Sequence, residues 1–161
     1  MRWIALLVVS GLIWGAAVAA QEVADIAPRA GWSVLPSAKS YDVLVEDTLA
    51  AARTVKLAVV TQAGPTGAAA NRGITIPGNR VIGVFNNDFA VRVLHLSTAA
   101  MIEAPIRLYV TENADGTASL SYKLPSAVLA PYTDEGGAKL IAIGAELDVL
   151  FATLAQNAVA Q

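Results

Sequence analysis

The residues best suited to chemistry are two cations and their neighbours on one predicted β-hairpin. Arg107 and Tyr109 precede a predicted turn, and Ser121 and Lys123 follow it. Alternation along each strand gives these side chains a common face. In the predicted register Arg107 lies opposite Lys123, where like charges repel, so this face could receive an anion or an acidic partner. The alternative is that both side chains extend into water, or that Glu103 lies between them.

A second candidate anion site lies at the predicted start of a helix. Asn86 and Asn87 precede Asp88, where the helical pattern begins, and either asparagine can act as its N-cap. The first N–H groups of a helix attract anions. We treat this pair as a ligand-binding hypothesis of lower weight than the hairpin face.

No residue pattern indicates a catalytic centre. His95 is the single histidine, and no carboxylate or nucleophile is spaced to work with it, so we interpret it as a partly buried helix residue. Asp134 and Glu135 are interpreted as a solvated turn, and nucleophile-elbow and phosphate-loop motifs are missing from the sequence. The chain has no cysteine, which excludes disulfides and thiolate metal sites. We therefore expect no metal or cofactor, and catalysis is the less favoured interpretation.

Two alternating segments, 106–110 and 117–124, must position these side chains. Each places apolar residues on one face and polar residues on the other. A loop at 114–116 lets Gly116 adopt the left-handed conformation that this turn requires. A slip of one residue would mix the two faces. The predicted pairs are Val110 with Leu120, Leu108 with Tyr122, and Ile106 with Leu124.

The remaining pattern predicts an α+β domain, in which helices pack on one face of a small, mainly antiparallel sheet. Apolar residues recur at helical spacing from 139 to 157, which is the clearest helix in the chain. Residues 64–78 are expected to form a loop with one helical turn, and 125–134 a loop or single turn. Other predicted elements are a short edge strand at 32–36, a helix from Ser40 or Asp42 to about Thr54 (Val43 and Val45 also allow a strand there), and buried strands at 56–62 and 80–85. A further helix is expected to begin near Asp88 and to stop before Pro105, with Ser97-Thr98 as a candidate break that divides it into two pieces.

The first 20 residues have the pattern of a signal peptide. Arg2 precedes an apolar stretch, and Ala17–Ala20 supplies small residues for cleavage before Gln21. The alternative is an uncleaved anchor, although the apolar stretch is short for a bilayer span. We accordingly divide the chain into a signal peptide at 1–20, an extended lead-in at 21–38 and one α+β domain at 39–161.

The composition of the chain limits the cellular locations and the classes of binding partner to be expected. The chain has 11 basic and 13 acidic residues and no basic stripe, which disfavours nucleic acid as a partner. No second apolar run is long enough to span a membrane after signal cleavage. We expect a periplasmic or secreted domain that is stabilised by packing, since disulfides are impossible.

The order of these motifs resembles the domain-of-unknown-function family numbered 302. The similar features are Val81–Asn86, the Ala104–Leu108 start of the hairpin, Asp115-Gly116 and Ser121-Tyr122, within about 41–132. The resemblance implies a compact α+β domain, often a homodimer, and no established reaction. Histidines common in the family before the second buried strand and near Tyr132 are missing here, so any function they carry elsewhere is in doubt.

Together these observations favour a small exported domain that acts without catalysis, by binding a small ligand or by forming a homodimer. A small anion is the ligand that the hairpin face favours. Two alternatives remain, a hydrolase-like enzyme that uses scattered carboxylates and hydroxyls, and an accessory subunit of an envelope complex.

Overall fold

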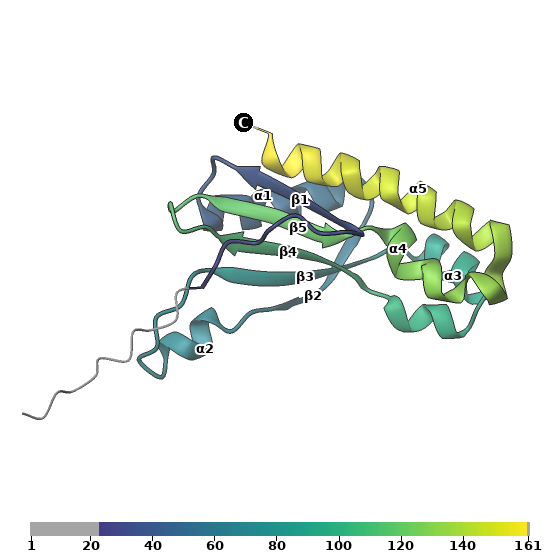
Figure 1. The fold of residues 1–161 in the computed structure, drawn as a ribbon, viewed down its shortest axis with the longest axis horizontal. Helices are drawn as coiled ribbons and strands as arrows, with labels where there is room; N and C mark the ends of the chain where they lie inside the picture. Colours follow the sequence, from purple (N-terminus) through teal and green to yellow (C-terminus); the bar gives the residue numbers. More distant parts are fainter. Residues whose placement is uncertain (1–22, 161) are drawn as a thin grey trace, which may run out of the picture.

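The computed structural model describes residues 23–160, which form a five-stranded antiparallel sheet and associated helices (Figure 1). The strand order is β1-β5-β4-β3-β2. The predicted signal peptide at 1–20 lies outside the described residues. The strands are β1 Trp32–Ser37, β2 Ala58–Ala63, β3 Asn79–Phe85, β4 Ile106–Glu112 and β5 Ala118–Lys123.

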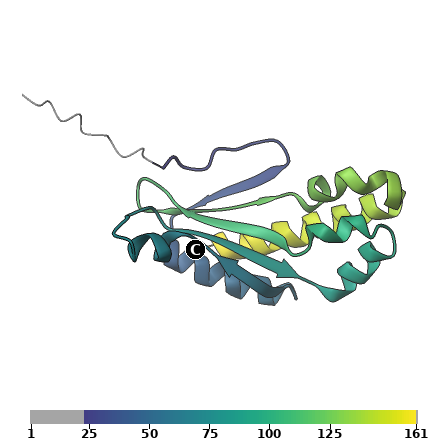
Figure 2. The same cartoon turned by 90° about the horizontal axis from the view of Figure 1, so that it is seen from below.

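Helices α1 and α5 lie side by side along one face of the sheet, whereas residues 23–31 pass along the other face (Figure 2). This arrangement confirms the predicted α+β class with helices on one face. The helices are α1 Tyr41–Thr54, α2 Thr66–Ala70, α3 Asn87–Leu94, α4 Pro125–Leu129 and α5 Thr133–Val159, with 3-10 helices η1 Ala99–Glu103 and η2 Ala130–Tyr132.

The predicted hairpin forms with the predicted turn. Asn113 N donates to the Thr117 carbonyl at 2.8 Å, which closes the loop at 114–116, and Gly116 has a φ of +81°. The third predicted pair is absent from the ladder, because β5 ends at Lys123 and the Leu124 N–H donates to Gly31. The confirmed pairs are Leu108 with Tyr122 and Val110 with Leu120.

The hairpin turn contains an acid-sensitive contact. Thr117 donates to Asp115 Oδ1 from its backbone N at 2.9 Å and from its hydroxyl at 2.6 Å. These hydrogen bonds favour the ionised carboxylate and hold the pKa of Asp115 below its usual value of 3.8. A lowered folded-state pKa stabilises the fold above pH 3.8, and this contribution is lost as the pH falls through the lowered value.

We expect Asp115→Asn to remove that acid-dependent part of the stability. Asparagine can still accept from Thr117, but it cannot titrate. Urea unfolding measured from pH 7 to pH 2 should therefore show the variant below the wild type at neutral pH, and the two converging in acid. Parallel stability curves would show that the contact contributes no pH dependence.

The core lies between the helices and the buried face of β4 and β5. Leu108, Val110 and Leu120 have no exposed surface, and the Tyr122 ring lies 5.5 Å from the Phe151 ring of α5. The predicted helix at 139–157 is confirmed within α5, which begins earlier, at Thr133. Gly137 interrupts its first part with a φ of +56°. The long helix α5 therefore packs on the buried face of the sheet.

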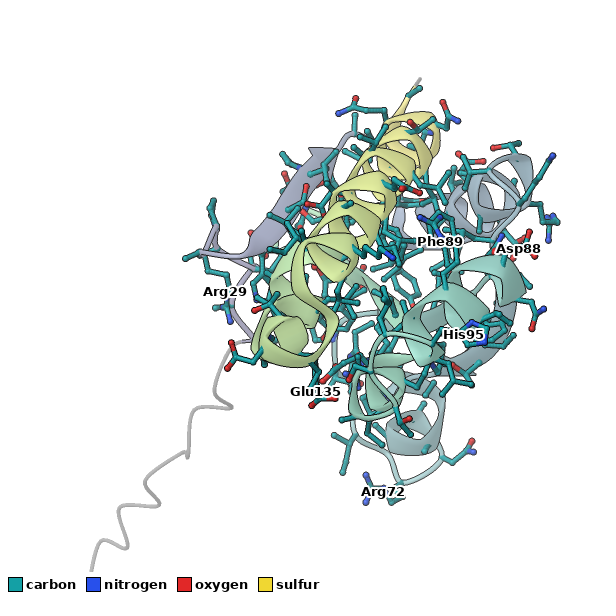
Figure 3. All side chains as sticks on the ribbon, turned by 90° about the vertical axis from the view of Figure 1, so that its right-hand side faces the viewer. Arg29, Arg72, Asp88, Phe89, His95 and Glu135 are labelled. Atoms are coloured by element: carbon teal, nitrogen blue, oxygen red, sulfur yellow. The ribbon has the colours of Figure 1, made fainter. Side chains whose placement is uncertain are left out.

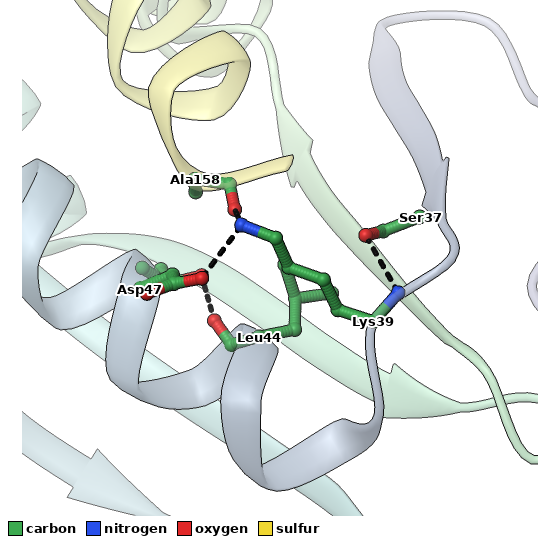
Figure 4. A network of polar contacts seen from close by, with 6 residues as sticks. Ser37, Lys39, Leu44, Asp47 and Ala158 are labelled. Atoms are coloured by element: carbon green, nitrogen blue, oxygen red, sulfur yellow. Dashed lines mark hydrogen bonds and ion pairs between the residues drawn. The ribbon is translucent and has the colours of Figure 1, made fainter. Parts of the chain in front are cut away.

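A lysine joins the start of α1 to the end of α5 (Figure 4). Lys39 Nζ donates to Asp47 Oδ2 at 2.6 Å and to the Ala158 carbonyl at 2.8 Å. The second contact places a cation at the negative end of the α5 dipole. Lys39 therefore ties the two helices that cover the sheet to each other.

Several local expectations were wrong. β2 is an exposed edge strand, because it pairs only with β3. His95 follows α3 and lies on the outer surface rather than partly buried, whereas Phe89 turns inward (Figure 3). Glu135 lies in the first turn of α5 and accepts from the Ser97 hydroxyl at 2.6 Å, so the 134–135 pair is not a loop.

The serines of β5 are buried, although alternation placed them on the wet face. Ser119 is 6% exposed and Ser121 has no exposed surface. β5 lies between β1 and β4, so Ser121 is flanked by Val34 and Tyr109 on neighbouring strands. Small side chains between larger neighbours lose contact with water on either face of a sheet.

Candidate functional site

A cavity of about 800 Å³ lies where the sheet is not covered by α1 and α5. We call it the open-face groove. It is lined by strand residues that alternation places opposite the core, above all Trp32, Val81, Arg107, Tyr109 and Lys123. The remaining lining residues are Ala63, Gly64, Pro65, Asn79, Glu103, Ile106, Tyr122 and Val128.

Pairing of neighbouring strands brings the main groups of this groove together. Arg107 and Tyr109 are two residues apart on β4, so they share a face. Val81 of β3 pairs with Tyr109, and Trp32 of β1 pairs with Lys123 at the end of β5. These main groups come from four strands, and Ala63 of β2 lines the groove as well, so the register of the whole sheet determines which side chains form this surface.

The two cations of the groove carry no neutralising partner among residues 23–160. Arg107 and Lys123 are exposed and lie in no ion pair there. Lys123 Nζ lies 5.8 Å from the centre of the Trp32 ring, which is the distance of a cation–π contact. A positive and partly aromatic surface therefore faces the cavity.

The groove contains one carboxylate, which is held on a different element. Glu103 ends η1, and its Oε1 accepts from the Tyr132 hydroxyl at 2.8 Å. This hydrogen bond favours the protonated phenol and raises the pKa of Tyr132 above its ordinary value. Glu103 forms no ion pair with Arg107 or Lys123, although all three residues line the groove.

The predicted hairpin cluster is brought together in part. Arg107, Tyr109 and Lys123 line the groove, whereas Ser121 does not, because its buried hydroxyl donates to the Tyr109 carbonyl at 3.4 Å. Trp32 was missed by sequence reasoning. Its predicted edge strand gave the only available signal, since nothing in the sequence indicates that this strand pairs with β5.

The asparagine pair lies elsewhere. Asn86 Oδ1 accepts from the Asp88 and Phe89 N–H groups at 2.9 and 3.2 Å, which confirms its predicted role as an N-cap. Its amide nitrogen donates to the Lys56 carbonyl, and Asn87 is exposed. Neither residue lines the open-face groove, so the two candidate anion sites are separate.

One side chain beside the groove offers a stability test. Thr111 Oγ1 is buried and has no hydrogen-bond partner among residues 23–160. Because an unpaired buried hydroxyl is unfavourable, we expect Thr111→Val to raise the free energy of unfolding by about 1 kcal/mol. Urea unfolding checks this, with Thr117→Val as the control, since its hydroxyl is bonded and its loss should destabilise. A destabilised Thr111→Val variant would contradict the expectation.

Two further searches concern the described residues only. No three histidine or acidic side chains in the part 23–160 lie close enough to hold a metal ion. None of the helices there combines the length and the apolar character that crossing a bilayer needs.

These features define a small α+β domain with a cationic, aromatic-lined groove on its exposed sheet face. The chain belongs to the family described as Domain of unknown function DUF302, whose model matches residues 33–154. The predicted resemblance is confirmed and extends beyond the range 41–132. No curated protein matches the sequence.

The fold also resembles a solved structure, described as the crystal structure of uncharacterized conserved protein DUF302 from Bacillus stearothermophilus. The two share 17% sequence identity with a TM-score of 0.71, over 81% of this chain and 99% of the other. At this identity the likeness concerns the fold alone.

Proposed function

We propose that this protein is an exported binding domain that holds a small amphipathic anion in the open-face groove. The observation that carries the proposal is the joint presence of Arg107 and Lys123, both outside any described ion pair, in a cavity walled by Trp32 and Tyr109. Leu108 pairs with Tyr122, so Arg107 and Lys123, the next residues outward on the two strands, lie at the same end of the hairpin. An anionic head group can interact with both charges at once.

The size and lining of the groove favour an organic ligand over a bare ion. Its volume of about 800 Å³ lies in the range of small-molecule sites, which are typically apolar with a few polar groups. Val81, Ile106 and Val128 supply apolar surface, and the cations lie on β4 and β5. A ligand with one anionic head and an apolar body matches both parts.

The lining chemistry favours binding over catalysis. A hydrolytic site needs a nucleophile or activated water beside a general base. Within the described part of the chain, Glu103 is the one carboxylate that lines the groove, and one of its oxygens accepts from the Tyr132 hydroxyl. The lining that residues 23–160 provide contains no serine, threonine or histidine.

Export is proposed from the leader pattern at 1–20, and would place the domain in the periplasm or outside the cell.

Homodimeric association is a second candidate, favoured by exposed apolar side chains on α3 and η1, two elements that contact each other. Ile102 is 79% exposed and Leu94 is 49% exposed. Native mass spectrometry of the wild type and Ile102→Glu tests it, and a monomeric wild type would remove this candidate.

Calorimetric titration with three unbranched eight-carbon compounds tests the anion proposal. Octanoate, 1-octanol and octylammonium have the same number of carbons and differ in head-group charge. We expect octanoate to bind most tightly and octylammonium least, because the cations of the groove face the head. Equal affinities for the anion and the cation, or no binding of any of the three, would overturn the proposal.

A further inference from the structure

A second, smaller cavity, which is partly open to solvent, lies next to the open-face groove. It measures about 50 Å³ and is lined by residues of α3, η1, α4, α5 and the ends of β3 and β4. Its walls include the buried side chains of Val93, Ala100 and Phe151. We call it the inner cavity.

The two cavities share a boundary. Glu103 and Ile106 line both of them, and both residues are half-buried. Ile106 directly precedes Arg107 in β4, so the boundary lies beside one of the groove cations. A molecule whose head reaches Arg107 thus has its body next to the inner cavity.

We infer that the inner cavity is a subsite for the end of an apolar ligand tail, reached from the groove past Ile106. This inference rests on the proposed function and names its ligand class, an anion with an unbranched hydrocarbon chain. Displacement of one half-buried side chain at the start of β4 joins the two spaces. The groove then holds the head and most of the chain, and the inner cavity holds its tip.

The chemistry of the walls supports a hydrocarbon occupant. Apolar side chains dominate the lining, so burial of a hydrocarbon tail against them is favourable. An apolar cavity of about 150 Å³ accepts benzene, so a space of about 50 Å³ suits about two carbons. The subsite therefore makes binding sensitive to chain length.

The test is a titration of the full chain with unbranched alkanoates from butanoate to decanoate. Burial of each added methylene should strengthen binding about fourfold until the inner cavity is full. Ala100→Leu fills the cavity from its wall. It should shorten the longest chain that still gains affinity by about two carbons, while the affinity for butanoate stays within twofold of the wild type.

Ala99→Leu is the matched control, because Ala99 is exposed on the same turn and does not line the cavity. If Ala100→Leu fails to fold, Ala90→Leu serves instead, since Ala90 lines the same cavity from α3.

Identical chain-length profiles in the wild type and the filled variant would overturn the subsite. If those profiles coincide but octanoate still binds in preference to octylammonium, the subsite alone fails. If no alkanoate binds, both proposals fail.

Discussion

Replacing Phe151 with alanine is expected to lower the free energy of unfolding by about 3–5 kcal/mol, which is the usual cost of removing a buried phenylalanine. Phe151 is 1% exposed and packs against the Tyr122 ring on the buried face of β5. Its loss leaves a cavity between α5 and the sheet, since the surrounding backbone is held by strand pairing. Urea or thermal unfolding measures the change.

Val149→Ala provides the matched control on the same helix. Val149 is 69% exposed, so its truncation should change the free energy of unfolding by less than about 0.5 kcal/mol. A small effect of Phe151→Ala, or equal effects of the two substitutions, would contradict the packing of α5 against the sheet.

The double substitution Arg107→Ala/Lys123→Ala is expected to weaken octanoate binding at least tenfold. A hydrogen bond to a charged group contributes about 1.5–3 kcal/mol, and about 1.4 kcal/mol corresponds to a factor of ten. Both residues are exposed and form no described ion pair, so the fold should keep its stability. Calorimetric titration measures the affinity, and thermal unfolding verifies the fold.

The control for that variant is Arg53→Ala/Lys139→Ala. It removes the same charge from exposed positions on α1 and α5, away from the groove lining. Octanoate affinity within about twofold of the wild type is expected. Equal losses in both double variants would show that net charge, rather than the groove, governs binding.

The hairpin and α5 were predictable because the sequence patterns that indicate them involve residues close to one another in the chain. In the hairpin, side-chain alternation and Gly116 agree on one register, so two of its pairs were predicted correctly. The 3.6-residue period identified α5 in the same way. Strand order was not predictable, because pairing of β1 with β5 joins Trp32 to Lys123 across most of the domain.

The residues of the groove also divide into those that local sequence patterns indicate and those that depend on long-range strand pairing. Arg107, Tyr109 and Lys123 follow from the hairpin register, so sequence reasoning grouped them correctly. Trp32 was missed, and the burial of Ser121 was not foreseen, because both depend on where β1 docks. The inner cavity arises from packing among α3, η1 and α5, which no residue pattern specifies.

The most direct test of the groove uses Trp32 as a reporter. The sequence contains three tryptophans, and Trp3→Phe/Trp14→Phe leaves Trp32 alone in the full chain. A bromine atom on an alkanoate quenches tryptophan fluorescence at contact, so 2-bromooctanoate, whose bromine is bonded next to the carboxylate, reports whether the ligand head reaches this ring beside Lys123. If the ligand binds in the groove, quenching saturates and unlabelled octanoate reverses it. Quenching that rises linearly with concentration and ignores octanoate would contradict it.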